Sequence, residues 1–263
     1  MKIRLATSFI ALSTALAAPA MADVTAADVL SNQQAFYGAM GVSLTGDLSG
    51  DTLSNPQMNV IFPDGVASLQ IATTGDITMS DVGDGSVLIS YPSPLLLSVS
   101  GGARGEGAFS VDLSMTHDGY TILATGDPDD ITYVADAQNI LFDVIDATMD
   151  GPDSDSFDIE GTLSFDSWAG TSNVTEGNLI SYTSNSELGT SAADFTFSAG
   201  SVVSTSAQTT QPVQSVVAVT LPVGGSDVMN LSAAMRNGLS VVLNTSGAGS
   251  TSSAETILDG EVL

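Results

Sequence analysis

The stretch Phe157-Asp-Ile-Glu-Gly-Thr-Leu-Ser-Phe-Asp166 decides the fold class of this 263-residue chain. Apolar and polar side chains alternate along it, and this period of two is typical of an antiparallel β-strand with one dry face and one wet face. The dry face consists of Phe157, Ile159, Leu163 and Phe165. Residues 87–91, 108–116 and 194–198 repeat the pattern, and clusters of Gly, Asp and Pro separate the repeats as turns. The sequence therefore predicts a mainly β protein with about fourteen or fifteen strands.

Two helices are predicted, one before the strands and one near their end. Over residues 25–40, Thr25 is an N-cap and Asp28, three positions later, completes a capping box. Over residues 226–237, apolar side chains share one helical face, and Gly238 is a stop signal.

The predicted sheet is too large for two short helices to cover. About fifteen strands at ~4.8 Å spacing make ~70 Å of sheet, more than an open sheet usually reaches without curling or splitting. Two architectures accommodate a sheet of this width: a large curved antiparallel sheet with an open concave face, or a sandwich. The sandwich is favoured by the general rule that apolar faces are buried internally.

The first 22 residues have the composition of a secretory signal peptide. Lys2 and Arg4 form a basic start, residues 5–18 are apolar or small, and Pro19-Ala-Met-Ala22 ends in an A-x-A pattern. The apolar run is shorter than the ~20 residues that span a bilayer. We therefore predict cleavage after Ala22, a periplasmic location, a single β-rich domain over residues 23–263, and no membrane-spanning segment.

The charge and the residue counts exclude several classes of function. Four basic residues against 30 acidic ones give a formal net charge of −26, and the predicted mature chain, with two Arg residues, reaches −28. Such a surface repels nucleic acid, which binds clustered Lys and Arg. The absence of Cys excludes disulfides and thiolate chemistry, and a single His excludes multi-His metal sites. High salt suits this surface, because screening reduces its self-repulsion.

No catalytic constellation is visible in the sequence, and we predict a protein without enzymatic activity. The only His, His117, follows a strand predicted to end at Thr116 and is interpreted as the tip of a turn. The Gly-x-Ser-x-Gly elbow of many Ser hydrolases is absent from the sequence. The only Trp, Trp168, is interpreted as a core or rim residue.

Calcium is the one cofactor for which the sequence offers ligands. Two acidic clusters carry the oxygen ligands that Ca²⁺ prefers. The candidates are Asp127, Asp129, Asp130, Asp150, Asp153 and Asp155. Neither cluster has the EF-hand spacing, and Asp is also a frequent turn residue, so the turn interpretation is favoured.

The order of elements and several short phrases resemble a known family. The phrases are Ala20-Met-Ala-Asp-Val-Thr25, Ile77-Thr-Met-Ser-Asp-Val-Gly-Asp-Gly-Ser-Val87 and Leu231-Ser-Ala-Ala-Met-Arg-Asn-Gly-Leu-Ser-Val241. With the leading helix, they resemble the N-terminal part of the alphaproteobacterial exported family called domain of unknown function 2125, over most of residues 1–250. The resemblance implies a short member of the family or a chain truncated at its C-terminus. It implies no assigned activity, substrate, cofactor or site residue.

Two functions follow as hypotheses. The first is a periplasmic protein that cradles a lipid or another hydrophobic molecule on a concave sheet face. The second is a structural or adhesive β-domain of a larger envelope assembly, with acidic loops that take Ca²⁺. Six apolar residues discriminate between them, because a closed core favours the second and an open groove favours the first. These residues are Phe109, Val111, Leu113, Phe157, Ile159 and Phe165.

Overall fold

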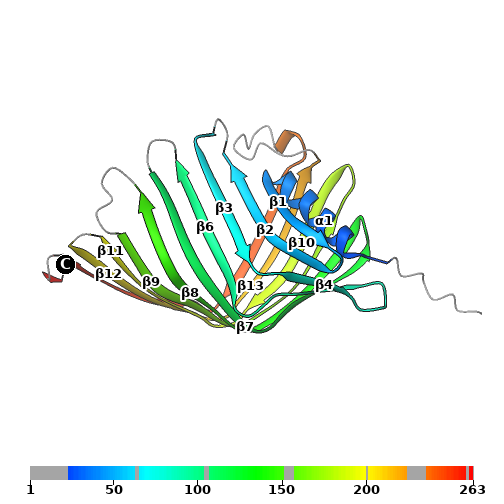
Figure 1. Cartoon of the computed structure of the whole chain (residues 1–263). Helices are drawn as coiled ribbons and strands as arrows, with labels where there is room; N and C mark the ends of the chain where they lie inside the picture. The colour runs from blue at the N-terminus through cyan, green and yellow to red at the C-terminus, as the bar shows by residue number, and fades with distance from the viewer. Residues whose placement is uncertain are drawn as a thin grey trace, which may run out of the picture.

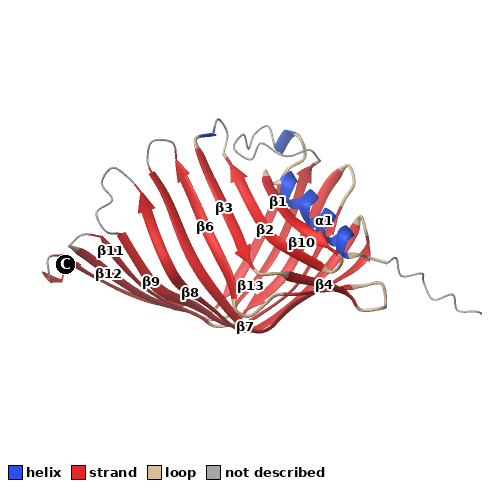
Figure 2. Ribbon diagram, in the orientation of Figure 1, coloured by secondary structure: helices blue, strands red, loops and turns tan. Residues whose placement is uncertain are grey.

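The computed structural model shows a large antiparallel β-sheet with one helix near its N-terminal end (Figures 1 and 2). It describes residues 23–62, 65–103, 107–150, 157–199, 201–223, 235–258 and 261–262. The predicted signal peptide lies outside the described residues. The mainly β fold class is confirmed.

Helix α1 (Ala26–Ala39) forms where the capping box predicts it. The backbone N–H of Asp28 donates to Thr25 Oγ1 at 3.2 Å, and the backbone N–H of Thr25 donates to Asp28 Oδ2 at 3.0 Å. Two of the unpaired donors at the helix start are thereby satisfied.

The second predicted helix lies mostly outside the described residues. Of its length, residues 235–237 are described; Met235 and Arg236 are helical, and Asn237 lies in a turn. The chain leaves this helical turn at Gly238, which has a φ of +104°. That conformation suits a glycine after a helix end.

Within the described ranges, sixteen strands form one hydrogen-bonded sheet. Their bounds are β1 Val42–Ser49, β2 Thr52–Ile61, β3 Ala67–Thr74, β4 Ile77–Asp81, β5 Val87–Ser90, β6 Leu95–Ala103, β7 Gly107–Asp127, β8 Asp130–Asp150, β9 Phe157–Thr175, β10 Leu179–Leu188, β11 Ser191–Ala199, β12 Val202–Thr210, β13 Val213–Pro222, β14 Ser240–Gly247, β15 Ser250–Leu258 and β16 Glu261–Val262.

The pairings show that these strands form an antiparallel meander. In the described chain each long pass across the sheet is antiparallel to the next, and short β16 is added beside β15. The successive passes are β1, β2, β3 with β4, β5 with β6, β7, β8, β9, β10 with β11, β12 with β13, and β14 with β15. A pass counted as two strands is one stretch of chain with an interruption in the middle.

The interruptions are in register, and we call the line they form the crease. They fall at residues 46, 55–56, 75–76, 92–94, 117–119, 139, 166–167, 189–190, 211–212 and 248–249. Left-handed backbone conformations recur along the line, as at Gly119 (φ +68°) and Asn139 (φ +49°). The Asn139 side-chain amide also donates to Asp118 Oδ2 at 2.7 Å across the crease. Residues that tolerate such backbone angles let a strand bend without ending.

The crease divides the sheet into two halves, which meet at the bottom of the curve in Figure 1. The helix half contains β4, β5, β10, β13, β14 and the adjoining ends of β7, β8 and β9. The open half contains β3, β6, β11, β12, β15 and the other ends of β7, β8 and β9. Helix α1 packs on the helix half, on the side that we call the inner face, where it buries Val29 against Ile89, Ile131 and Val174.

Of the two predicted architectures, the structure shows the open curved sheet. The described strands pair edge to edge in one layer rather than in two packed layers (Figure 2). The apolar side chains of the helix half are covered by α1, whereas those of the open half continue along the same face beyond it.

Candidate functional site

The first candidate is the inner face of the open half, which we call the apolar face. Cross-strand pairing aligns its side chains in rows, such as Leu97 with Leu113 and Val144. The set comprises Leu97, Val99, Phe109, Val111, Leu113, Phe142, Val144, Phe157, Ile159, Leu163, Phe165 and Phe195. All of them are half-buried, although they lie in or beside the centre of a large sheet.

The six discriminating residues all belong to this apolar face. None of Phe109, Val111 and Leu113 on β7 is fully buried, and the same holds for Phe157, Ile159 and Phe165 on β9. They line an open face rather than a closed core.

Two phenylalanine rings of this face lie against glycines of the neighbouring strands. A Cβ atom at Gly101 would lie 2.9 Å from the ring of Phe109, and one at Gly161 would collide with the ring of Phe195. Each pair is directly cross-strand. The rings thus cover bare backbone and keep the face smooth and apolar.

The second candidate is a cavity of about 370 Å³ between α1 and the inner face, next to the crease. Six of its lining residues are the five tyrosines and the single tryptophan of the chain. These are Tyr37, Tyr91, Tyr120, Tyr133, Trp168 and Tyr182. We call this cavity the aromatic pocket.

Small residues create the space. Along β9, Trp168, Gly170, Ser172 and Val174 alternate onto the inner face, so two small positions lie between two large ones. Along β10, Tyr182 is followed by Ser184 and Ser186, and pairing places these serines beside Ser172 and Gly170. The resulting patch of small side chains is the floor of the pocket.

The aromatic rings form two groups, one at the crease and one at the helix. At the crease, Tyr91 stacks on Tyr120 with ring centroids 4.4 Å apart, and Tyr120 lies 5.4 Å from Trp168. At the helix, Phe36 stacks on Tyr182 at 4.7 Å. Offset and tilted ring pairs of this kind stabilise packing beyond their buried area.

The lining of the pocket is polar in places but uncharged. It contains hydroxyl groups and the amide of Gln33, and no Asp, Glu, Lys or Arg is among the described residues that line it. Burial raises the pKa of Tyr91 to about 12 and also raises the pKa of Tyr120 and of Tyr133. The phenols therefore stay protonated at neutral pH and offer neutral hydrogen-bonding groups.

A buried polar network fastens α1 behind the pocket. Asn32 is fully buried; its side-chain amide donates to Glu176 Oε1 at 3.0 Å, and its Oδ1 accepts from the hydroxyl of Tyr133 at 2.8 Å. Burial raises the pKa of the Glu176 carboxyl, the hydrogen bond from Asn32 lowers it, and the nearby Asp129 raises it, with a net upward shift.

His117 does not form the tip of a turn, so that prediction is wrong. Strand β7 continues through it, and its side chain is buried at the crease. The backbone N–H of Tyr120 donates to Nδ1 at 3.0 Å, so Nε2 carries the proton that is donated to the Pro92 carbonyl at 3.1 Å. Both ring nitrogens are occupied by backbone partners, and the residue joins β7 to the loop between β5 and β6.

The acidic candidates do not converge in the described chain. Asp127 and Asp130 face each other at the β7–β8 hairpin. The carboxylate of Asp130 accepts from the Asn173 amide at 2.8 Å and from the Thr175 hydroxyl at 2.9 Å, and the Asp129 carbonyl accepts from a backbone N–H. Asp150 is exposed at the end of β8. Asp153 and Asp155 lie outside the described residues. No group of three His, Asp or Glu residues with metal-binding geometry occurs among the described residues.

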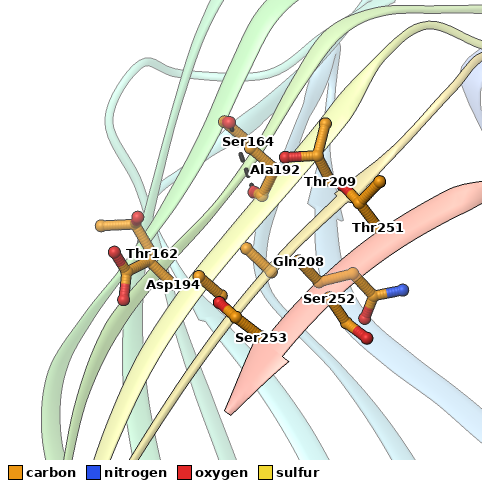
Figure 3. Close-up of a pocket in the computed structure, with 11 residues that line it drawn as sticks. Thr162, Ser164, Ala192, Asp194, Gln208, Thr209, Thr251, Ser252 and Ser253 are labelled. Atoms are coloured by element: carbon orange, nitrogen blue, oxygen red, sulfur yellow. Dashed lines mark hydrogen bonds between the residues drawn. The ribbon is translucent and has the colours of Figure 1, made fainter. Parts of the chain in front are cut away.

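A shallow hollow of about 420 Å³ crosses β9, β11, β12 and β15 (Figure 3). Most of its lining residues alternate with the apolar ones and so lie on the opposite, polar face. Figure 3 shows Thr162, Ser164, Asp194 and Thr209 around it, with Ser164 Oγ donating to the Ala192 carbonyl at 3.4 Å. The described residues that line this hollow include no aromatic ring. The aromatic pocket and the apolar face are therefore the more distinctive features.

No helix within the described ranges combines the length and the apolar composition needed to cross a bilayer. No family model, curated protein or solved structure matches the chain.

Proposed function

We propose that this chain is an exported, periplasmic protein without enzymatic activity that binds a hydrophobic molecule on its apolar face. The observation that carries the proposal is the row-by-row continuity of half-buried apolar side chains over the open half, on the inner face beyond α1. A contiguous exposed apolar surface of this kind marks a ligand or partner site.

The chemistry of the face favours an alkyl chain. Its side chains are aliphatic or phenyl, and cross-strand pairing aligns them in rows that a linear molecule follows. Burial contributes ~0.8 kcal/mol per CH₂ group, so a fourteen-carbon chain gains ~11 kcal/mol gross. Association costs at least ~4 kcal/mol, which leaves at most ~7 kcal/mol and a Kd on the order of 10 µM.

Export is supported by the sequence of residues 1–22. The resemblance to the exported family stays a prediction, and it agrees with this compartment.

The test is native mass spectrometry of the mature protein with added 1-tetradecanol. We expect a one-to-one complex for the wild type. Val111→Asp places a carboxylate on the apolar face and should weaken binding at least tenfold. Ser110→Asp adds the same charge one residue away on the polar face and should bind as the wild type does.

Two outcomes contradict the proposal. One is a ligand-free mass at every alcohol concentration, which would favour the structural or adhesive envelope domain. The other is equal loss of binding in Val111→Asp and Ser110→Asp, which would place any bound alcohol elsewhere.

A further inference from the structure

The aromatic pocket and the apolar face adjoin each other at the crease. Tyr91, Tyr120 and Trp168 line the pocket, and the same three residues pack around a buried cluster that includes Leu95 and Met115. Leu97, Phe142 and Phe165 of the apolar face pack on that cluster as well. A single molecule can therefore occupy both without leaving the inner face.

The lining determines what kind of chemical group fits the pocket. The aromatic rings of the lining favour a flat partner, and hydroxyls on the floor favour oxygen or nitrogen atoms that form neutral hydrogen bonds. An anionic group finds no Arg or Lys in the lining and meets the negative field of a chain with a net charge of −26. A cation finds no carboxylate among the described residues of the lining. Tyr91 and Tyr120 stack on each other, so one face of each ring is not accessible to a cation.

The size of the pocket further restricts the chemical class of the ligand. A cavity of ~150 Å³ holds one benzene molecule. The aromatic pocket, at about 370 Å³, has room for a ring system of two rings.

We propose that the aromatic pocket holds the uncharged, flat ring end of an amphiphile whose alkyl chain extends over the apolar face. This inference rests on the proposed function and adds the chemical class of the ligand. The pocket supplies the selective contacts, and the apolar face supplies chain-length-dependent affinity.

Trp168 makes the pocket directly observable, because it is the only tryptophan. The probe is N-phenyl-1-naphthylamine, which is neutral, has two linked aromatic groups and accepts excitation energy from tryptophan. Its matched control is 8-anilino-1-naphthalenesulfonate, which has the same skeleton with a sulfonate. We expect saturable energy transfer from Trp168 to the neutral probe, and binding of the sulfonate at least tenfold weaker.

A pair of variants on β10 assigns the signal to the pocket. Ser184→Phe fills the floor and should reduce the affinity for the neutral probe at least tenfold. Asn185→Phe adds the same ring to the opposite, exposed side of the strand and should leave the affinity unchanged. Ser172→Leu also fills the floor, with a smaller side chain, and should likewise reduce the affinity for the neutral probe. It replaces Ser184→Phe if that variant does not fold.

Each outcome separates this inference from the proposed function. Equal affinity for both probes, or energy transfer that survives both filling variants, overturns the inference. Tetradecanol binding without energy transfer from Trp168 to the neutral probe overturns the inference and leaves the proposed function standing. Energy transfer that Ser184→Phe abolishes, without any tetradecanol binding, supports the ring site and overturns the alkyl-chain part.

Discussion

Asn32 is the residue on which the placement of the helix depends. It is a polar side chain with no exposed surface, and it satisfies its hydrogen bonds with Tyr133 and Glu176 rather than with water. A buried amide that loses such partners costs ~1–3 kcal/mol, so the network fixes α1 in one position on the sheet. Because Tyr133 also lines the aromatic pocket, this position sets the shape of the pocket.

Glu176 makes this network sensitive to pH. Its pKa in the folded chain is raised above the ordinary 4.5, so the ionised form is less favourable in the folded state than in the unfolded state. Protonated Glu176 contributes fully to the stability of the folded chain below the ordinary pKa of 4.5. This contribution is lost as the pH rises through the higher pKa that Glu176 has in the folded chain. Glu176→Gln should therefore raise the Tm at about pH 7.5, and the difference from the wild type should shrink toward about pH 4.

The control for Glu176→Gln is Glu160→Gln, which removes an exposed carboxylate from the polar face of β9. It reports the general benefit of removing one negative charge. An equal rise of the Tm in both variants, at both pH values, would show that burial of Glu176 has no effect of its own.

The crease is the feature that matters most at the scale of single elements. In β7, Gly119 has a φ of +68° and open space around the position of a Cβ atom, so the backbone angle alone demands glycine there. An L-residue in this conformation costs ~1–2 kcal/mol.

Gly119→Ala should accordingly lower the stability by ~1–2 kcal/mol, measured by denaturant unfolding. Gly38→Ala is the matched comparison, because that glycine lies in α1, also has open space around it, and should gain ~0.5–1 kcal/mol as alanine. If Gly119→Ala were as stable as the wild type or gained stability as Gly38→Ala does, the strand would not depend on the left-handed angle at the crease.

Local sequence signals predict the helix and the strands, but at the crease the same signals predict turns. The capping box of Thr25 and Asp28 acts within one turn, so the sequence alone predicts α1. The crease uses Gly, Asn, Asp and Pro, which are also the residues of hairpin turns. His117-Asp118-Gly119 therefore predicts a turn although the strand continues.

The aromatic pocket could not be predicted in the same way. Its tyrosines lie between residues 37 and 182, and only the pairing register brings them together. One signal was available in the sequence: Trp168 and Tyr182 are each followed at alternate positions by two small residues, a pattern that leaves space above a sheet.

At the scale of the whole molecule, charge opposes the compact form. The chain has 30 acidic residues and four basic ones. The Debye length is ~30 Å at 0.01 M salt and ~3 Å at 1 M, so repulsion extends over the domain in the first case and only between neighbours in the second.

The Tm should therefore rise from low to high NaCl. Millimolar CaCl₂ should raise it further than MgCl₂ at equal ionic strength only if the acidic clusters at 127–130 and 150–160 bind Ca²⁺. Equal shifts with both ions mean screening alone, and a Tm independent of NaCl would contradict the effect of net charge.

The Asn32–Glu176 contact also has a consequence for how the chain assembles. The sheet is a meander of neighbouring passes, so most of its pairings close short loops, whereas this contact joins residues 144 positions apart. Each doubling of loop length costs ~0.6 kcal/mol in closure entropy, which favours local pairings early. We therefore expect α1 to dock after the neighbouring passes have paired, and the aromatic pocket to be among the last parts of the molecule to form.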